Sequence, residues 1–555
     1  MARRLMALLA LVVLVAAGCA RPVIPEKPVS GGTITLGLLR APGGVFRPLV
    51  SEERDSAVVS QLMYSGLLRT GPQLEPICDL CADFTISADQ RTVTFHLRKD
   101  VLWHDGKPFT AEDVVFTYQA MLAPEYSGPH TGKLTALRGA RVLLDERDAA
   151  DRDVAAGKIS MAEGAARKAA AWKRWLDGPG RQAMAMADAY TVSFSADTPY
   201  APLFTALMLP IAPAHTQEAV GTGPFKLMEF RKGEYLKLVR HEPYHLGKPY
   251  AEAAIARVVP PGKALEMLQA GSVDYVPLSA EEASNLVDGQ PISLVEWPSA
   301  GYQYLGLNHD RPPFSDSRVR QALMYGINRR WLVDELLHGH GAVVNTHVTP
   351  GHWAAPEGLN GYPYDPGKAA TLLAEAGWSA LDAAGYRVRD GHRLQFTLVY
   401  PKGNPVREAS AAMIQRNLRA LGVKADLQLM EFGRLIREVF GQRQVDAWLL
   451  GWDLGRDPDP GPVFSPDNKW GQVSGWSSER SEELILRGRQ AMAVSERKPV
   501  YAEWLKLLNE ELPYLFLYVE NEVAGVRSDR LRGVKADARG ALWNVWEWWI
   551  PEEKQ

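Results

Sequence analysis

A strand, a helix and a second strand follow one another between residues 394 and 429, and this order restricts the possible folds more than any other feature of the sequence. Apolar residues occupy every second position from Leu394 to Tyr400, which predicts a strand. Residues 406–421 predict a helix, and Gly422 stands where a glycine commonly ends one. Alternation resumes from Val423 to Leu429. Such a unit predicts parallel strands joined by a right-handed crossover, and therefore an α/β fold.

Another apolar run, "DAWLLGW" at residues 446–452, predicts a strand that is buried on both faces. The loop "GWDLGRDPDPGPVF" begins at the carboxyl end of this strand. Ligands of open α/β sheets bind beyond the carboxyl ends of the strands, so this loop is the first candidate for a binding site.

The length of 555 residues predicts about three domains or lobes. Hydrophobic residues make up 46% and charged residues 23% of the chain, as in ordinary globular proteins. The formal charge of −3 and the lack of a dense Lys/Arg stripe argue against binding to nucleic acid. The 16 Trp and 19 Tyr residues favour large cores or a pocket lined by aromatic rings.

The N-terminus predicts export from the cytoplasm. Arg3 and Arg4 precede residues 5–17, an apolar run that is too short to span a bilayer comfortably, and this is the pattern of a signal peptide. Gly18-Cys19 resembles the end of a bacterial lipobox, in which the cysteine is acylated and becomes the first residue of the mature protein.

We therefore expect residues 1–18 to be a lipoprotein signal peptide and Cys19 to carry the lipid, with secretion without a lipid as the alternative. Ala16 departs from the usual lipobox, because Leu is most common at that position. The Pro-rich residues 19–30 are expected to form a flexible tether between the membrane and the folded body.

Cys78 and Cys81 form a C-x-x-C pattern. Outside the cytoplasm a local disulfide is one interpretation, and two inert thiols are the other. A zinc site needs two more ligands, and a thioredoxin-like role needs a strand–helix–strand context that is missing here.

The string His241-Glu242-Pro243-Tyr244-His245 matches the zinc-protease pattern H-E-x-x-H, which requires both histidines on one face of a helix. Pro243 lacks an N–H and its ring clashes with the preceding turn, at a cost of about 3 kcal/mol inside a helix. A helix that begins at Pro243 excludes His241. We therefore interpret the string as a turn that binds no zinc.

The N-terminal part contains both strand and helix patterns. Residues 93–97 alternate as a half-buried strand, and Thr110 with Asp113 forms a capping-box pattern that begins a helix. Residues from about 140 to 187 are rich in Ala, Arg and Asp and predict a helical insertion of two antiparallel surface helices, whose function the sequence does not reveal.

Five stretches resemble motifs of the family 5 extracytoplasmic solute-binding proteins, the peptide and nickel receptors of ABC importers. They occur in the order of the family and span most of the mature chain. The stretches are "VLWHDGKPFTAEDVVFTYQAM" (101–121), "GTGPFKLMEF" (221–230), "LGLNHDRPPFSDSRVRQALMYGINR" (305–329), "YDPGKAATLLAEAGW" (364–378) and "DAWLLGWDLGRDPDP" (446–460). The insertion at 140–187 is longer than the family pattern leads us to expect.

The resemblance implies an α/β clamshell of two lobes, like the periplasmic binding proteins of type II (cluster C-like), with an extra subdomain in the N-terminal lobe. Lobe I is expected to combine residues 31–50, 190–300 and 514–555. Residues 51–189 are expected to form the subdomain attached to it, and residues 301–513 lobe II. The chain is expected to cross between the lobes near "GYQYLGLN" and near "YLFLYVENEVAGV".

The resemblance also implies that an extended peptide lies in the cleft between the lobes, held mostly through its main chain. Gly451-Trp452 matches a pair that precedes an aspartate, three residues after the Trp, which binds the ammonium group of the peptide. Gly455 replaces that aspartate here. Acidic residues occur nearby at Asp453, Asp457 and Asp459. One of them takes over the role, or the ligand lacks a free amine, or these residues only shape a Pro-rich turn.

The same resemblance places further ligand-binding residues at Phe432, Tyr518, Tyr302 and Trp476. For each of them, packing in the core is the alternative. No residue matches the arginines that meet the ligand's carboxylate in some relatives. The possible substitutes are Arg434, Arg437 and Arg456.

A histidine-rich segment leaves a metal ligand open. Four histidines lie within 15 residues, at His338, His340, His347 and His352. Imidazole binds Ni, Cu and Zn well, so a metal or metal chelate is one interpretation and a Gly-rich loop without metal is the other. We assign no metal ligand and expect no cofactor.

These observations predict a lipid-anchored, monomeric receptor on the periplasmic side of the bacterial cell membrane, which captures short peptides and delivers them to an ABC permease and ATPase complex. The alternative ligands are a metal chelate, a sugar or another small solute. An extracytoplasmic hydrolase is least favoured and no catalytic residue is assigned, because the chain has no G-x-S-x-G, no P-loop and no usable H-E-x-x-H.

Overall fold

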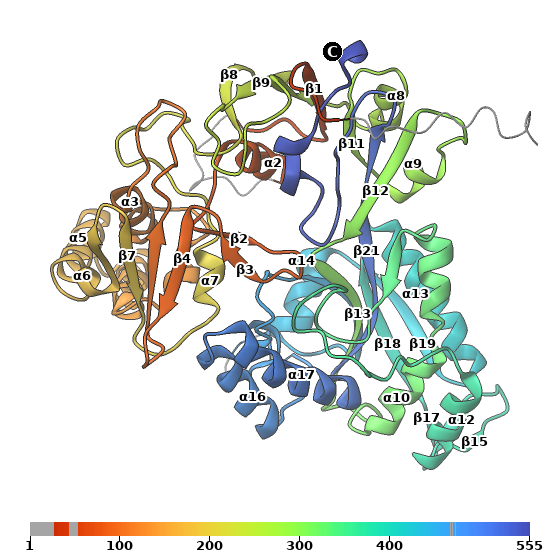
Figure 1. Ribbon diagram of the computed structural model, residues 1–555. Coiled ribbons are helices and arrows are strands. Elements are labelled where there is room, and N and C mark those ends of the chain that lie inside the picture. The colour runs from red at the N-terminus through yellow and green to blue at the C-terminus, as the bar shows by residue number, and fades with distance from the viewer. Residues whose placement is uncertain (1–26, 44–53, 467, 469, 472) are drawn as a thin grey trace, which may run out of the picture.

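The computed structural model describes residues 27–43 and 54–555, apart from residues 467, 469 and 472. Within them the chain forms an upper and a lower half on one shared sheet, with a smaller unit beside them (Figure 1). The predicted signal peptide and Cys19 lie outside the described residues, as does most of the tether. In the described part, no helix has both the length and the apolar character that crossing a membrane requires.

The upper half is built on strands that come mostly from the N-terminal part of the chain. These strands are β1 (Thr33–Leu38), β8 (Phe225–Arg231), β9 (Tyr235–Arg240), β10 (Ala253–Val258) and β11 (Tyr275–Leu278). β1 runs parallel to β10 and β11, and β9 runs antiparallel to its neighbours β8 and β10. Ile34, Leu36 and Trp548 belong to the core of this half, so the C-terminal segment closes it.

The lower half contains the predicted strand–helix–strand unit. Its members are β18 (Gln395–Pro401), α13 (Pro405–Ala420) and β19 (Lys424–Met430), with β20 (Ala447–Asp453) and β13 (Gly301–Leu307) beside them. β18 runs parallel to both β19 and β20. Gly422 has φ +78°, a left-handed conformation that glycine adopts without strain. The unit confirms the predicted α/β fold.

A single long strand, β21 (Tyr514–Arg527), joins the two halves. Residues 514–518 pair with β13, and residues 521–527 pair with β12 (Ile292–Pro298). The order in the sheet is β19-β18-β20-β13-β21-β11-β1-β10-β9-β8, and β12 and β14 (Gly341–Val343) also pair with β21. The chain therefore crosses between the halves at β21 and at the short connection from β12 to β13. The limits of the lobes remain predictions.

The smaller unit has its own sheet and core. Its sheet has the order β4-β5-β7-β6, made of β4 (Cys81–Ile86), β5 (Thr92–Leu97), β7 (Thr191–Ser195) and β6 (Met184–Asp188). Its helices include α3 (Ala111–Leu122), α4 (Ala140–Ala155), α5 (Met161–Asp177) and α6 (Pro179–Ala183). Tyr118 of α3 packs edge-on against Phe194 of β7, with ring centroids 5.1 Å apart. The predicted helical insertion is thus present, but its helices end at Ala183 and strand β6 follows.

A hairpin of β2 (Leu68–Thr70) and β3 (Pro76–Cys78) reaches from the smaller unit towards the lower half (Figure 1). The Trp353 N–H donates a hydrogen bond of 2.8 Å to the carbonyl oxygen of Gln73 at its tip. Cys78 and Cys81 form a disulfide at its base. The disulfide therefore links the end of the hairpin to the beginning of β4.

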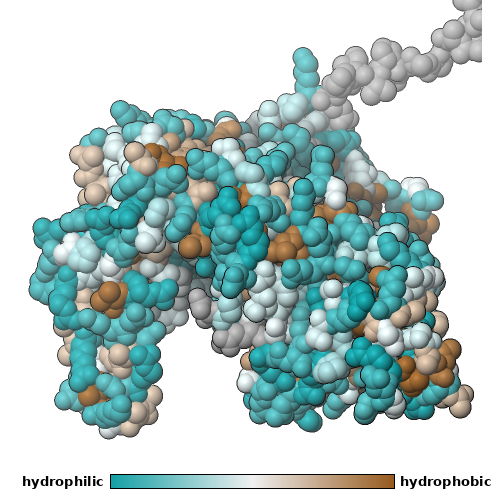
Figure 2. Space-filling model, turned by 90° about the horizontal axis from the view of Figure 1, so that it is seen from below, coloured by the Kyte–Doolittle hydropathy of each residue, from teal (hydrophilic) through white to brown (hydrophobic). Residues whose placement is uncertain are grey.

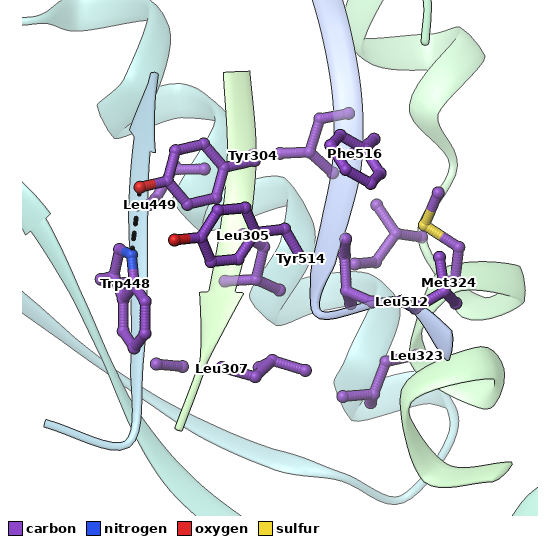
Figure 3. Close-up of a cluster of buried hydrophobic side chains, with 14 of the residues drawn as sticks. Tyr304, Leu305, Leu307, Leu323, Met324, Trp448, Leu449, Leu512, Tyr514 and Phe516 are labelled. Atoms are coloured by element: carbon purple, nitrogen blue, oxygen red, sulfur yellow. Dashed lines mark hydrogen bonds between the residues drawn. The ribbon is translucent and has the colours of Figure 1, made fainter. Parts of the chain in front are cut away.

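Aromatic side chains fill the core of the lower half next to the crossing (Figure 3). The rings of Tyr304 and Tyr514 stack with centroids 4.3 Å apart, and Trp448 Nε1 donates to the Tyr304 hydroxyl at 3.4 Å. Helix α17 (Val494–Glu511) packs on this core through Trp504, whose Nε1 donates to Ser481 Oγ of α16 (Glu479–Gln490) at 2.9 Å. Much of the aromatic content therefore serves the core rather than a pocket.

Candidate functional site

The crossing strands separate two sets of cavities on opposite faces of the sheet. Side chains alternate along β20, so Gly451 and Asp453 share one face and Trp452 belongs to the other. α13 covers the first face, because Arg407 of α13 comes within 2.9 Å of the position that a Cβ atom on Gly451 would take. Trp452 stacks parallel to Tyr304 on the second face, with centroids 6.3 Å apart.

On the α13 face lies a cavity of about 980 Å³, which we call the rear cavity. Both halves line it, with residues 278–281 and 520–522 from the upper half and residues 301–303, 405–407 and 451–453 from the lower half. Its charged side chains are the carboxylates Glu281, Asp453, Glu520 and Glu522 and the guanidinium of Arg407. The rear cavity is therefore acidic.

Glu520 is the most enclosed of these carboxylates. Burial raises the pKa of Glu520, while Arg407 and a hydrogen bond from Gln303 lower it. Gln303 Nε2 donates to Glu520 at 3.2 Å, and Arg407 Nε donates to Gln303 at 2.8 Å. A chain of polar contacts thus links α13 to β21 across the rear cavity.

On the opposite face the two halves enclose a narrow space of about 20 Å³, which we call the front neck. Leu74 of the hairpin, Ser299 and Ala300 of the crossing, and Gly455 line it together with Ala538. From the same loop as Gly455, Arg456 donates from Nη1 to the carbonyl oxygen of Ala538 at 3.1 Å, which links the lower half to the C-terminal segment. The loop predicted as the first candidate site therefore lies at the contact between the halves.

A wider space of about 300 Å³, which we call the basic pocket, adjoins the front neck at Arg456. Arg69 of the hairpin and Arg539 and Trp543 of the C-terminal segment also line it. Its only acidic lining residue among those described is Asp79, whose carboxylate is 2.8 Å from His245 Nε2. Seen from below, the surface is indented between the smaller unit and the lower half (Figure 2). We call the front neck and the basic pocket together the front cleft.

The three acids of the predicted loop take different positions. Asp453 is exposed and lines the rear cavity, and its carboxylate makes no hydrogen bond or ion pair within the described residues, although its charge acts on Arg456. Asp457 lines the front neck, but both of its oxygens accept hydrogen bonds of 2.7 Å from Arg497. Asp459 is buried and paired with Arg489 at 2.9 Å. None of the three therefore offers a free carboxylate to the front cleft.

The other predicted ligand-binding residues are not gathered in one place. Gly451, Trp452 and Tyr302 line the rear cavity, although the Trp452 ring stacks on Tyr304 on the opposite face and the Tyr302 hydroxyl points to His347 Nδ1 at 3.0 Å. Tyr518 is buried with its hydroxyl 3.2 Å from Ser410 Oγ, and Trp476 is buried with its Nε1 bound to Glu511. Phe432 is 56% exposed and lines none of the three cavities. Their roles in binding remain predictions.

The histidine-rich segment is split between the two faces. His338 and His340 line the rear cavity, whereas His347 and His352 line the front neck. Burial lowers the pKa of His347 to about 3 and that of His352 to about 4, so both imidazoles are neutral at neutral pH. No group of side chains with metal-ligand geometry occurs within the described residues.

The string at residues 241–245 forms a turn after β9. The Tyr244 N–H donates to the carbonyl oxygen of His241 at 3.1 Å, and His241 Nε2 lies 3.0 Å from the carbonyl oxygen of Leu102. His245 Nε2 lies instead 2.8 Å from Asp79, so the two histidines bind different partners, as expected for a turn.

Two residues of the front cleft carried no signal in the sequence. Arg69 stands in the unremarkable strand "LRT", and Trp543 belongs to a short 3-10 helix near the C-terminus. They line one pocket only because the hairpin and the C-terminal segment meet in the fold. Pairs so far apart in the chain leave no spacing pattern to detect.

A sequence model described as bacterial extracellular solute-binding proteins, family 5 Middle, matches residues 75–474. The oligopeptide-binding protein AppA of Bacillus subtilis is 28% identical over 537 residues, which cover 94% of this chain and 92% of AppA. The structure of AppA in complex with a nonapeptide has a TM-score of 0.64 and 25% sequence identity, over 95% of this chain and 100% of that chain.

Two other relatives bind different solutes. The structure of NikZ from Campylobacter jejuni in complex with Ni(L-His) has a TM-score of 0.65 and 25% sequence identity, over 93% of this chain and 99% of that chain. Heme-binding protein A of Haemophilus influenzae is 26% identical over 461 residues, which cover 79% of this chain and 77% of that protein. These likenesses confirm the predicted fold class and leave several ligand classes to be weighed.

Proposed function

Because the chain belongs to the bacterial extracellular solute-binding proteins of family 5, we propose that it captures short peptides in the front cleft and delivers them to an ABC permease and its ATPase. It is an extracytoplasmic, non-enzymatic receptor of an ABC transporter. The peptide ligand, the use of the front cleft and the lipid anchor on Cys19 are the parts that we propose.

The observation that carries the proposal is the position of the loop after β20. This loop lies at the carboxyl end of a strand, where ligands of α/β sheets bind. Gly455 and Arg456 lie in the front neck against Ala538, so this loop lines a space that both halves enclose. Two-lobed receptors bind their solutes in such a space, because closure then buries the solute.

The crossing explains how the space opens. The halves are joined at residues 298–301 and 518–522. Rotation about the crossing separates Arg456 from Ala538 and Trp353 from Gln73, and water replaces these hydrogen bonds. It also withdraws Met492 from the core of the smaller unit, which exposes one apolar side chain. A peptide that contacts both sides then favours the closed arrangement.

Isothermal titration calorimetry of the chain from Lys27 onward tests the proposal, with alanine peptides of two to five residues as ligands. We expect binding to at least one length, with unchanged peptide recovered by mass spectrometry. Arg456→Gln, in the front cleft, is expected to weaken binding about ten-fold. If no peptide of any length binds, or if Asp453→Asn in the rear cavity has the larger effect, the peptide proposal or its placement is wrong.

A metal complex is the second candidate ligand. His347 and His352 line the front neck as neutral imidazoles, which is the form that binds metal. Titration with the Ni(II) complex of histidine, in parallel with the peptides, distinguishes the two candidates. Binding of the complex without binding of any peptide replaces the first proposal by the second.

A further inference from the structure

Met492 is a residue of the lower half that is buried in the core of the smaller unit. It lies in the short connection between α16 and α17, yet its side chain is only 4% exposed and belongs to the core that α3 and the sheet of the smaller unit form. Methionine is flexible and fills irregular apolar spaces well. The smaller unit and the lower half therefore share an apolar contact.

Two hydrogen bonds from main-chain N–H groups lie beside this side chain. The Met492 N–H donates to Gln90 Oε1 at 3.1 Å, and the Ala201 N–H donates to the carbonyl oxygen of Arg489 at 2.7 Å. Gln90 lies in the turn between β4 and β5 with φ +57°, a conformation that residues other than glycine adopt rarely. We call the buried Met492 side chain and these two hydrogen bonds the latch.

The smaller unit is bound to the upper half, so the latch connects the two halves across the front. The Asp79 carboxylate of the smaller unit lies 2.8 Å from His245 Nε2 of the upper half. The His104 N–H donates to the carbonyl oxygen of Gly221 at 2.9 Å. The smaller unit approaches the lower half beside α16, away from β21 (Figure 1). Rotation about the crossing therefore separates the two sides of the latch.

The latch is also connected to the loop after β20. Arg489, whose carbonyl oxygen accepts the hydrogen bond from Ala201, pairs through its guanidinium with Asp459 at 2.9 Å. Asp459 is buried and belongs to the same loop as Gly455, which lines the front neck. One arginine thus contacts both the smaller unit and the loop that lines the front cleft.

We propose that the latch stabilises the closed arrangement of the halves and that Met492 is a positioning residue, which raises the affinity for the solute without contacting it. This rests on the proposed function only in that a solute binds between the halves. Met492 is buried when the halves are closed and exposed when they separate, so its burial favours the closed arrangement alone. A solute that requires closure then binds more tightly, because more of the protein is competent to bind it.

Small-angle X-ray scattering of the protein without solute is one arm of the test. Met492→Ala is expected to give a larger radius of gyration than the wild-type protein, because most of the apolar contact is lost. Met492→Leu keeps the size and the apolar character and is expected to match the wild-type protein. Met121→Ala is the matched control, since Met121 is buried in the same core but belongs to α3 of the smaller unit itself. It is expected to lower Tm and to leave the radius unchanged.

The other arm measures the affinity for alanine peptides of two to five residues by calorimetry. Met492→Ala is expected to weaken binding about ten-fold, and Met492→Leu is expected to stay within about two-fold of the wild-type protein. Gln90→Gly removes the acceptor of the Met492 N–H and keeps the turn, because glycine adopts a positive φ without strain. It is expected to weaken binding about three-fold, and it serves if Met492→Ala does not fold.

The outcomes separate the latch from the proposed function. Unchanged scattering and unchanged peptide affinity in Met492→Ala overturn the latch while peptide binding stands. A larger radius in Met492→Ala, together with no binding of any peptide, supports the latch and overturns the peptide function. Equal losses of affinity in Met492→Ala and Met121→Ala assign the effect to the stability of the smaller unit and overturn the latch.

Discussion

Both carboxylate oxygens of Asp457 accept hydrogen bonds from Arg497, each at 2.7 Å, and the Arg497 side chain is almost completely buried. This ion pair fastens the loop after β20 to α17. The loop therefore presents its main chain and Arg456 to the front cleft from a fixed position, while Asp457 itself is occupied.

Asp457→Asn is expected to destabilise the protein strongly, because it leaves the Arg497 charge buried without its partner. Loss of one member of a buried pair costs about 3–5 kcal/mol of the free energy of unfolding. Urea unfolding at pH 7 measures this loss. Glu438→Gln breaks the more exposed pair with Arg434 and is the control, with an expected loss below about 1 kcal/mol. Equal losses in the two variants contradict the prediction.

Asp453→Asn is expected to leave solute affinity within about two-fold of the wild-type value, since Asp453 lines the rear cavity and not the front cleft. Calorimetry with any ligand found for the wild-type protein checks this. Asp390→Asn, at a side chain that is 89% exposed, is the control for a change of one charge. A loss of affinity confined to Asp453→Asn means that the solute occupies the rear cavity.

Acid is expected to destabilise the wild-type protein in part through His347. Burial lowers the pKa of this imidazole to about 3, from an ordinary value of 6.5. Between these values the unfolded chain binds a proton that the folded protein does not, so stability falls as the pH falls from about 6.5 towards 3. From pH 7 to pH 5 this one group costs about 2 kcal/mol.

His347→Gln removes that proton and is expected to lose about 2 kcal/mol less than the wild-type protein over the same pH change. Urea unfolding at pH 7 and pH 5 gives the four free energies that the comparison needs. His338→Gln changes an exposed histidine and is expected to follow the wild-type protein. An identical pH dependence in His347→Gln and the wild-type protein refutes the assignment.

Joint replacement of Cys78 and Cys81 by serine is expected to cost about 2 kcal/mol, because the disulfide closes only a short loop and so restricts the unfolded chain little. Thermal unfolding with and without a reductant measures the effect. Reduction is expected to lower the Tm of the wild-type protein to that of the double variant and to leave the variant unchanged. A reductant effect on the variant would assign the loss to something other than this bond.

Periodicity predicted the parts of the fold that depend on local pattern. The strand–helix–strand unit ending at Met430 was predictable because apolar spacing changes from two to about 3.6 residues and back. Strand β6 was missed inside the predicted helical insertion. Its sequence "MAMAD" has weak strand propensity, and it is a strand because Met184 to Asp188 pair with β7.

The site was predictable only at the level of the loop. The rule for carboxyl ends of strands indicated residues 451–464, and this loop does lie between the halves. The rule does not distinguish the two faces of the sheet, so it could not separate Asp453 from Asp457. The rule could not identify Arg69 either. Arg69 lies on a hairpin far away in the sequence and lines the pocket only because of the tertiary structure.

The shared strand β21 has a consequence for biosynthesis. The sheet of the upper half needs residues 521–527 beside β12 and β11, and that of the lower half needs residues 514–518 beside β13. Neither part of the sheet is complete until the ribosome has made residues 514–527. A nascent chain that is exported therefore cannot complete its fold, and stays able to pass through a translocation channel, until β21 has been synthesised.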